Sequence, residues 1–568
     1  MEMLFVLVYS ILLIGTIVVP INNIKSDFLY RSIFGIIITF GINIIISIIT
    51  YLLGLKCSIE LLSVIYFFLL IPIIYIILKE KRIQLLDVSL QDIVFGILSG
   101  IVIIIIMMKQ YGTPLRIKYE TTDASTHFSA AISFMNDETL LLKDNSKLNE
   151  EFGFDRLMFG SYVNTGIFIS IFSNFLPQME LYKLYIVFDM IILWLSILMF
   201  YIMLNSKTNL KRKIIIWIFS YIYFLSYPLN SVLMGSAYLT LSLLLVTTIL
   251  VVFINKQEMK SSLFYLLLFV LNTALINTYM LFAIIVLISE IIYIGFKQKK
   301  IIPCIMILLP VLSILLYANN ASEKLQIIQE EGPMYKNYYS NFIIFVPLIV
   351  TQFYKDIKNK EFFNIENVFL LVNIIILIVT YILKQKAVVS SYYCLKYYYI
   401  LWIFTIFISG KMLLKLSNYR LALSILFTIV ILITISISRL EYTYSGEELM
   451  EDITKESVFS IGDGFYNNIN IILSKMYIMN EEELKVINKV KEMGIEEFRI
   501  LGGEGQNKWI YAILNQYVDS NIYVEDIDDK YLICFKRATY IHQNIHKIKE
   551  KYEFIYENKY GGIMKKYE

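Results

Sequence analysis

Charged residues are scarce in this chain, and that scarcity excludes whole classes of protein. Asp, Glu, Lys and Arg together make up only 17% of its 568 residues, while hydrophobic residues make up 58%. A soluble globular protein of this length would have too apolar a surface at that composition. The formal net charge of +3 also lies too near zero to indicate binding to nucleic acid.

Cysteine and histidine are rare as well. The chain has three histidines, and only His127 lies near its apolar stretches. The four cysteines are scattered, which excludes a disulfide framework and a cysteine-based metal spacing: Cys57, Cys304, Cys394 and Cys534. We expect no cofactor, and the sequence gives no indication of metal dependence.

Long apolar stretches are what the chain has instead. Many run for about 17–25 residues, the length that crosses about 30 Å of hydrocarbon as a helix. We expect a mainly α polytopic membrane protein with about fourteen transmembrane helices. The first is expected to be a membrane helix and not a cleaved signal peptide, and the pair at 261–275 and 278–296 could instead be one kinked hairpin. The expected spans are 3–20, 33–54, 60–78, 91–108, 182–204, 213–227, 236–254, 261–275, 278–296, 301–317, 341–354, 366–383, 394–409 and 419–438.

The distribution of Lys and Arg predicts the orientation of these spans. Basic clusters in the short loops fall on one face only if residues 109–181 form a single outer loop. The apolar piece 159–176 must then lie on the membrane or dip in and return. Both the N-terminus and the C-terminal segment are then outside. Lys384, Lys386 and Lys396 lie outside as well, against the positive-inside rule.

Residues 440–568 differ in character from the membrane domain expected at 1–439. Alternating patterns at 457–462, 496–503, 531–536 and 552–566 predict strands, and helical patterns lie at 464–475, 481–493 and 508–518. This alternation predicts a small extracytoplasmic α/β domain. Gly502, Gly503 and Gly505 match no nucleotide-binding fingerprint, so we expect a turn there.

The segment 116–136 is the first of three places where chemistry is expected. Asp123 and His127 lie four residues apart in what should be a short amphipathic helix, so their side chains share one face, with Glu120 shortly before them. A carboxylate at the membrane boundary can take a proton from a hydroxyl while close to a lipid-held substrate. The alternative is that Asp123 only caps the helix.

Two further clusters are expected on the same face. The loop 318–340 combines Tyr335 and other tyrosines with acidic residues, a mixture suited to a sugar-like acceptor or to an interfacial aromatic belt. The segment 384–399 contains Tyr392, Tyr393 and Lys396. A lysine at the tyrosine-rich start of a membrane helix is costly unless it snorkels or has an anionic partner, such as a lipid phosphate.

These strings resemble those of a known family. The string from Thr122 to Phe128, TDASTHF, looks like the acidic motif in the first outer loop of the GT-C superfamily of polyprenyl-phosphate-sugar glycosyltransferases. The string Tyr392-Tyr393-Cys394-Leu395-Lys396 is similar to a Tyr-Tyr-x-x-Lys element of its cell-wall members. Two features depart from the family: four spans precede the loop, and the acidic motif is Asp-x-x-x-His, not an adjacent Asp-Glu pair.

The resemblance implies inverting transfer of a sugar from a polyprenyl-phosphate donor to a glycan or glycolipid acceptor outside the membrane. Asp123 would be the general base, and Lys396 would hold the donor phosphate. His127, Glu120, Tyr392, Tyr393 and Tyr335 would contact substrates. The alternatives are a polysaccharide polymerase or ligase, a sugar or lipid transporter or flippase, and a non-catalytic assembly partner. Few buried charges lie in the spans, chiefly Asp189 and Glu290, which disfavours transport.

Overall fold

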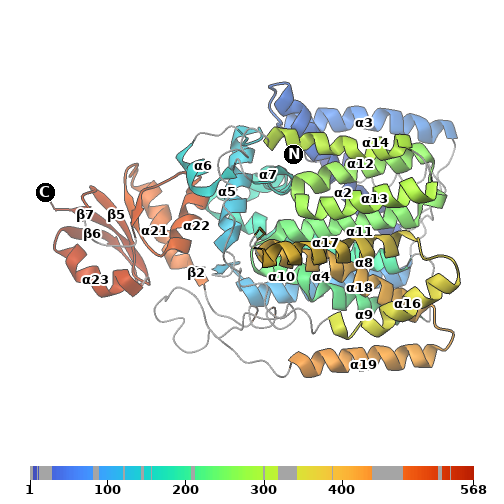
Figure 1. The fold of residues 1–568 in the computed structure, drawn as a ribbon. Helices are drawn as coiled ribbons and strands as arrows, with labels where there is room; N and C mark the ends of the chain where they lie inside the picture. Colours follow the sequence, from blue (N-terminus) through green and yellow to red (C-terminus); the bar gives the residue numbers. More distant parts are fainter. Residues whose placement is uncertain are drawn as a thin grey trace.

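The structure is a computed structural model, and Figure 1 shows its two parts, a long helical bundle and a smaller sheet-containing domain at one end of the bundle. The described residues are 4, 6–8, 10–11, 28–80, 89–118, 122–142, 146–154, 157–205, 212–298, 301–317, 342–386, 388–389, 391–437, 468, 472, 477–521, 527–537 and 539–567.

Eight helices of the bundle, counted over the described residues, are long and apolar enough to cross a membrane. A helix pairs its backbone groups internally, as hydrocarbon requires. The protein is therefore a membrane protein, as the apolar stretches predict. These eight are α2 (Phe28–Leu52), α4 (Leu90–Tyr111), α8 (Tyr182–Asn205), α9 (Lys213–Phe224) continued by α10 (Tyr227–Leu233), α11 (Ala237–Ile254), α12 (Ser261–Thr278), α17 (Ile365–Gln385) and α18 (Ser391–Leu414).

Four further helices contribute shorter apolar stretches: α3 (Ile59–Glu80), α13 (Met280–Tyr293), α14 (Ile301–Leu308) with the 3-10 helix that follows it, and α19 (Tyr419–Ile437). The expected span at 341–354 corresponds to α16 (Val346–Lys358), which has 13 residues. At about 1.5 Å per residue it is shorter than the hydrocarbon core. The expected span at 3–20 lies mostly outside the described residues, so a total of about fourteen stays a prediction.

The pair α12 and α13 forms a hairpin. Tyr279, in an extended conformation, is the only residue between the two helices. Asn272 Nδ2 donates a hydrogen bond of 2.7 Å to Glu290 Oε2, and both side chains are buried. Residues 18 apart would be about 27 Å apart along a continuous helix, so this bond shows that the chain folds back on itself.

The described part of the expected outer loop at 109–181 contains three α-helices and two short 3-10 helices. Helix α4 ends before Gly112, which has a φ of 71°, a backbone conformation that favours glycine. Then come strand β1 (Ile117–Lys118), helix α5 (Thr122–Asp137), helix α6 (Lys147–Phe152) and helix α7 (Phe159–Phe172). Figure 1 shows these helices at the end of the bundle that faces the sheet-containing domain. They therefore form a layer between the two parts of the protein.

Helix α7 is inserted among the long helices and does not lie flat over their ends. It packs against α2, α5, α8 and α12. Asn43 of α2 donates a hydrogen bond of 3.0 Å from Nδ2 to Asn164 Oδ1 of α7. Asn43 lies nine residues before Leu52, the end of α2, which is about 14 Å along that helix. Helix α7 therefore lies among the long helices, and its position relative to the membrane stays a prediction.

The sheet-containing domain has five strands in the order β4-β3-β5-β7-β6. Strands β4, β3 and β5 are parallel, and β5, β7 and β6 are antiparallel. The expected α/β character is therefore present, although the expected boundary at 440 and the strand at 457–462 lie outside the described residues. The elements are β3 (Arg499–Leu501), β4 (Ser520–Asn521), β5 (Tyr531–Phe535), β6 (Tyr552–Glu557), β7 (Gly561–Lys566), α21 (Glu481–Glu492), α22 (Glu504–Leu514) and α23 (Thr539–Lys549).

Helix α22 lies four residues earlier than the expected 508–518. Gln506 Oε1 accepts a hydrogen bond from the Gly503 backbone N–H, which caps the first turn at Glu504. Asn515 ends the helix in a left-handed conformation, with a φ of 51°. Gly502 and Gly503 thus form the turn between β3 and α22, as expected.

A buried ion pair fills the space at the carboxyl ends of β3 and β5. Arg537 donates to both carboxylate oxygens of Glu483 on α21, from Nε at 2.9 Å and from Nη2 at 2.7 Å. Gln506 Nε2 also donates to Glu483, at 2.9 Å. Open α/β sheets commonly bind ligands at this edge. Here the chain's own carboxylate occupies it. Glu483 joins α21 to the end of β5 through Arg537 and to α22 through Gln506.

The sheet-containing domain docks on α5, the helix that carries Asp123. The rings of Phe128 on α5 and Trp509 on α22 stack with centroids 5.9 Å apart. Ser133 Oγ donates a hydrogen bond of 2.9 Å to Asn515 Oδ1. Strand β2 (Tyr477–Met479), which the sequence analysis does not anticipate, pairs with β1 in an antiparallel two-stranded sheet. The docking therefore fixes α5 relative to both parts of the protein.

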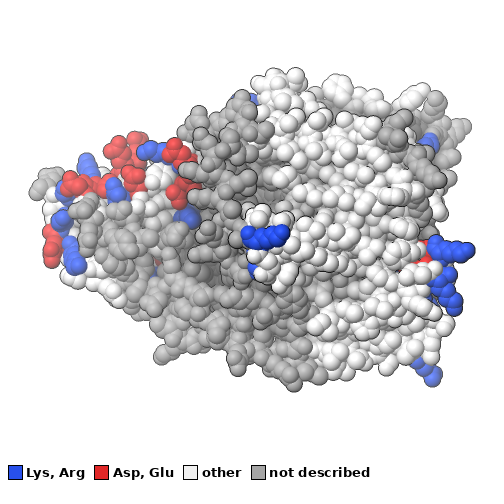
Figure 2. Space-filling view, viewed as in Figure 1, with Lys and Arg blue, Asp and Glu red and all other residues white. Residues whose placement is uncertain are grey.

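Charged side chains lie mainly at the two ends of the molecule. Figure 2 shows Lys, Arg, Asp and Glu on the sheet-containing domain and Lys or Arg at the opposite end of the bundle. On the face shown, the bundle between them is mostly uncharged, and one patch of Lys or Arg lies nearer its end that faces the sheet-containing domain. A belt of this kind is what hydrocarbon requires of the surface that faces it.

Candidate functional site

The candidate site forms where α5 meets the ends of α11 and α18. Asp123 lies in the first turn of α5, where the helix dipole favours a carboxylate, and its side chain is exposed. Because the helix begins at Thr122, Asp123 lies inside the first turn and not before it. His127 follows one turn later on the same face, as the spacing predicts.

Lys396 of α18 is fully buried, with an exposed fraction of 0%. Its Nζ donates a hydrogen bond of 3.0 Å to the hydroxyl oxygen of Tyr238, at the start of α11. The same Nζ lies 5.3 Å from the ring centroid of Tyr238 and 5.5 Å from that of Tyr279. These aromatic faces stabilise a cation that has lost its water. Lys396 thus points into the protein and does not snorkel to the surface.

His127 joins this cluster through Tyr238. The centroids of the His127 and Tyr238 rings are 4.7 Å apart, and the Tyr238 and Tyr279 rings are 5.6 Å apart. Tyr238 is half-buried, so it connects the buried Lys396 to the accessible side of the site. Asp123, His127 and Lys396 therefore belong to one site, although Lys396 lies far from the other two in sequence.

The electrostatics of α5 follow from this arrangement. Surrounding protein raises the pKa of Asp123 above its ordinary value, and the positive charges of Lys396 and then Lys508 oppose that rise. Burial, followed by the charge of Lys396, lowers the pKa of His127 to about 4. At neutral pH, Asp123 can thus accept a proton more readily than an ordinary carboxylate, while His127 is uncharged.

The other predicted site residues have different positions. The half-buried Tyr393 lies in the first turn of α18, one turn before Lys396. Glu120 and Tyr335 lie outside the described residues, and so does the side chain of Tyr392. Only Tyr393 can therefore be placed relative to the cluster.

Two members of the cluster were missed by sequence reasoning, Tyr238 and Tyr279. Tyr279 is the residue between α12 and α13, directly after the polar Asn277 and Thr278. That polar junction inside an apolar pair of spans was a usable signal for Tyr279. Tyr238 has no comparable signal, since it is one tyrosine among 43 and begins an ordinary apolar helix.

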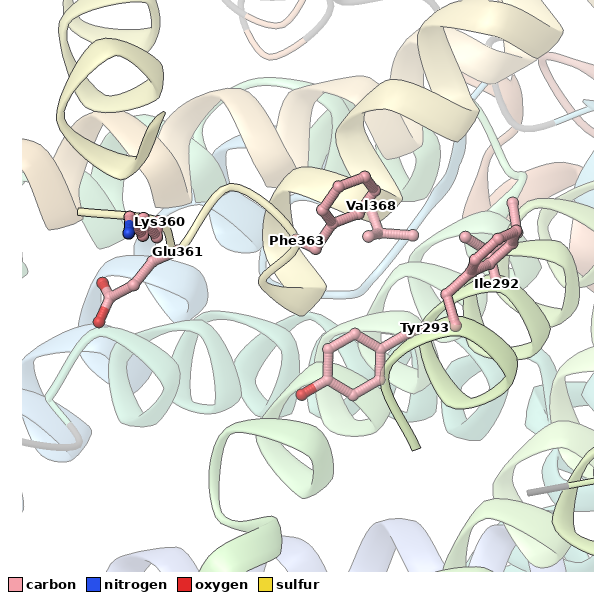
Figure 3. Close-up of a pocket in the computed structure, with 7 residues that line it drawn as sticks. Ile292, Tyr293, Lys360, Glu361, Phe363 and Val368 are labelled. Atoms are coloured by element: carbon pink, nitrogen blue, oxygen red, sulfur yellow. The ribbon is translucent and has the colours of Figure 1, made fainter. Parts of the chain in front are cut away.

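A separate cavity of about 320 Å³ lies at the other end of α13 (Figure 3). The chain runs from Tyr279, at the site, to Tyr293, at this cavity, which is about 21 Å along a helix. The cavity is lined by one basic and one acidic residue among mainly apolar side chains: Ile292, Tyr293, Phe296, Lys360, Glu361, Phe363 and Val368. Among the predicted site residues whose side chains the structure describes, none lines this cavity.

Within the described residues, no group of three or more His, Cys, Asp or Glu side chains could hold a metal ion. The site therefore offers a carboxylate that can accept a proton and a buried cation linked to a tyrosine hydroxyl.

No family model matches the chain, and no curated protein matches it.

Proposed function

We propose that this protein is an inverting membrane glycosyltransferase that moves a sugar from a polyprenyl-phosphate donor to a glycan or glycolipid acceptor in the cell envelope. The observation that carries the proposal is the meeting of Asp123 and Lys396 at one site through Tyr238 and His127. Sugar transfer from a lipid phosphate needs a base for the incoming hydroxyl and positive charge for the leaving phosphate.

Asp123 is the general base in this proposal. Its carboxylate takes the proton of the acceptor hydroxyl as that oxygen attacks the anomeric carbon. The bond from that carbon to the donor phosphate breaks, and its electron pair leaves with the phosphate. Crowding by protein raises the proton affinity of Asp123, and its side chain is accessible to an acceptor. His127, uncharged at neutral pH, lies one turn further along the helix.

Lys396 acts on the phosphate through Tyr238. Because Lys396 is fully buried and donates to the Tyr238 oxygen, a phosphate cannot reach its ammonium group directly in this arrangement. The hydrogen bond from a cation polarises the Tyr238 hydroxyl and makes it a stronger donor to a phosphate oxygen. Tyr238 thus contacts the donor, and Lys396 supplies the charge behind it.

The proposal includes an orientation for the protein. The α5–α7 layer and the sheet-containing domain lie outside the cytoplasm, and the bundle end that carries Lys355, Lys358 and Lys360 lies inside. Lipid-linked donor and envelope acceptor then meet at the same face as Asp123.

Transfer itself tests the proposal. The purified protein in lipid nanodiscs is supplied with undecaprenyl-phosphate glucose, mannose, galactose or N-acetylglucosamine, together with delipidated envelope glycan from the source cell. We expect one donor to lose its sugar to the glycan with inverted anomeric configuration. Release of undecaprenyl phosphate with none of these donors, in the presence of acceptor, contradicts the proposal.

A further inference from the structure

A small cavity lies beside the candidate site, between the bundle and the sheet-containing domain. Its lining includes Ala124, the residue after Asp123, and Gly235, three residues before Tyr238. The lining is otherwise aromatic or apolar except for one carboxyl group: Tyr111, Ile117, Tyr185, Ile186, Asp189 and Trp509. The cavity thus adjoins the site on two sides, through α5 and through the turn that precedes α11.

Asp189 of α8 is the acidic residue of this lining. It is 5% exposed, and no hydrogen bond or ion pair joins it to the residues that the structure describes. Tyr185, on the same helix, interacts electrostatically with both Asp189 and Asp123. A carboxyl group this deep in the protein is costly unless something hydrogen-bonds to it.

Trp509 supplies a second polar group, and it comes from the other part of the protein. It lies on α22 and is 1% exposed. Its indole Nε1–H has no hydrogen-bond partner within the described part of the chain. Buried polar groups in native proteins nearly always have partners, so two of them lining one cavity indicate a missing occupant.

The chemistry of the pair defines that occupant. A carboxylate accepts hydrogen bonds, and an indole N–H only donates them. A hydroxyl group satisfies both at once, because it donates to Asp189 and accepts from Trp509. An apolar group would leave both unpaired. The cavity has room for about one water-sized group, which fits one hydroxyl.

We infer that this cavity is a subsite for one hydroxyl group of the sugar substrate, formed jointly by Asp189 and Trp509. The identity of the ligand rests on the proposed function. Aromatic side chains around a few placed polar groups are typical of small-molecule pockets, and Tyr111, Tyr185 and Trp509 provide them here. The sheet-containing domain then completes the sugar site, and its docking on α5 determines which sugar is accepted.

Deoxy-sugar donors test the inference through transfer. The wild type is compared on its preferred polyprenyl-phosphate sugar and on each monodeoxy analogue. We expect kcat/KM to fall at least about tenfold for one analogue, since a site built for a hydroxyl rejects ligands that lack it. Trp509→Phe keeps the ring against Phe128, and Asp189→Asn keeps the size of the side chain. In both variants, the ratio of kcat/KM for the parent donor to kcat/KM for the deoxy analogue should fall towards one.

Trp217→Phe is the matched control. The indole N–H of Trp217 is also buried without a partner, but Trp217 lies on α9 and does not line the cavity. This variant should keep the wild-type ratio. If Trp509→Phe and Asp189→Asn keep it as well, or if the wild type rejects no analogue, the occupant is a structural water and the inference is wrong.

Sugar binding without transfer separates this inference from the proposed function. Tryptophan emission is followed while methyl glucoside, mannoside, galactoside or N-acetylglucosaminide is added to the protein in nanodiscs. We expect a saturable change with one sugar in the wild type and in Asp123→Asn, and at least about tenfold weaker binding in Asp189→Asn. If the sugar binds in this way but no transfer is found, the subsite is supported and the proposed glycosyltransferase activity is wrong. No change with any of these sugars in the wild type would remove the subsite.

Discussion

Lys396 donates a 3.0 Å hydrogen bond to the hydroxyl oxygen of Tyr238, and the lysine is fully buried while the tyrosine is half-buried. The pair therefore presents a positive charge to the site through a hydroxyl group. An exposed lysine could bind an anion equally well. Its free-energy cost would be lower, because burial of a cation is unfavourable. Because Lys396 is buried, its charge reaches the site through neighbouring side chains, above all through the Tyr238 hydroxyl.

Removing either member of this pair should weaken binding of the lipid phosphate. A charge-assisted hydrogen bond is typically worth about 1.5–3 kcal/mol, which is about 10–150-fold in affinity. We expect a loss in this range for Lys396→Met, and a loss for Tyr238→Phe although the phenyl ring remains. Lys384→Met, at the end of α17, is the control and should bind normally. Undecaprenyl phosphate binding in nanodiscs measures all three, and equal small effects would leave Lys396 without a role in the donor site.

The loss of activity on the acid side of the pH–rate profile should reflect protonation of Asp123. A general base must be deprotonated, so activity is lost as pH falls through its pKa, which here lies above the ordinary value of about 4. The charge of Lys508 holds that pKa down. Lys508→Met should therefore move the acid limb of kcat/KM to higher pH.

His127→Gln should leave the limb in place, because His127 is already uncharged above about pH 4. Lys489→Met, on the exposed face of α21, controls for a general loss of positive charge. Profiles of kcat/KM between pH 4 and 8 decide the matter. If His127→Gln moves the acid limb and Lys508→Met does not, Asp123 is not the general base.

The Glu483–Arg537 pair should be essential for the sheet-containing domain. Both side chains are buried, at 0% and 4% exposed, and the contact is bidentate. Arg537→Met leaves the Glu483 carboxylate buried without its cation, a change that typically costs about 3–5 kcal/mol. Lys485→Met breaks only an exposed pair with Glu482 and should have no measurable effect. Heating in detergent followed by size-exclusion chromatography should show early loss of the peak of folded protein for Arg537→Met alone.

The proposed orientation predicts which positions are accessible from outside the cell. Single cysteines replacing Ser146, at the start of α6, and Gln543, on the exposed face of α23, should react with a membrane-impermeant maleimide in intact cells. A cysteine replacing Asn359, at the end of α16, should react only after the cells are opened. Reaction at Asn359 in intact cells, or protection of the other two, would reverse the orientation.

Sequence patterns predicted the parts of this fold that depend on local composition. Apolar stretches such as 182–204 and 236–254 became α8 and α11, because hydrocarbon admits few alternatives to a helix. The spacing of Asp123 and His127 placed them on one face of α5, which follows from helical geometry alone. The position of Lys396 against the positive-inside rule singled it out before any contact was known.

What the sequence could not predict depends on which helices become neighbours. The Lys396–Tyr238 hydrogen bond requires α18 to pack against α11, and no local pattern encodes that pairing. Strands of two or three residues, such as β1 and β2, are too short to show an alternating pattern. The contact of Trp509 with Phe128 joins two parts of the chain that sequence analysis treated as separate domains.

The central claim is that Asp123 is the base of a sugar transfer, and Asp123→Asn tests it most directly. Asn keeps the size of the side chain and can still accept hydrogen bonds from the helix start, but it cannot take a proton. Transfer from the polyprenyl-phosphate sugar is measured in nanodiscs, with protein amount and donor binding checked in parallel. We predict a loss of about 10²–10⁴ in kcat with donor binding retained. Turnover at the wild-type rate would show that Asp123 only shapes the start of α5, and would contradict the glycosyltransferase mechanism.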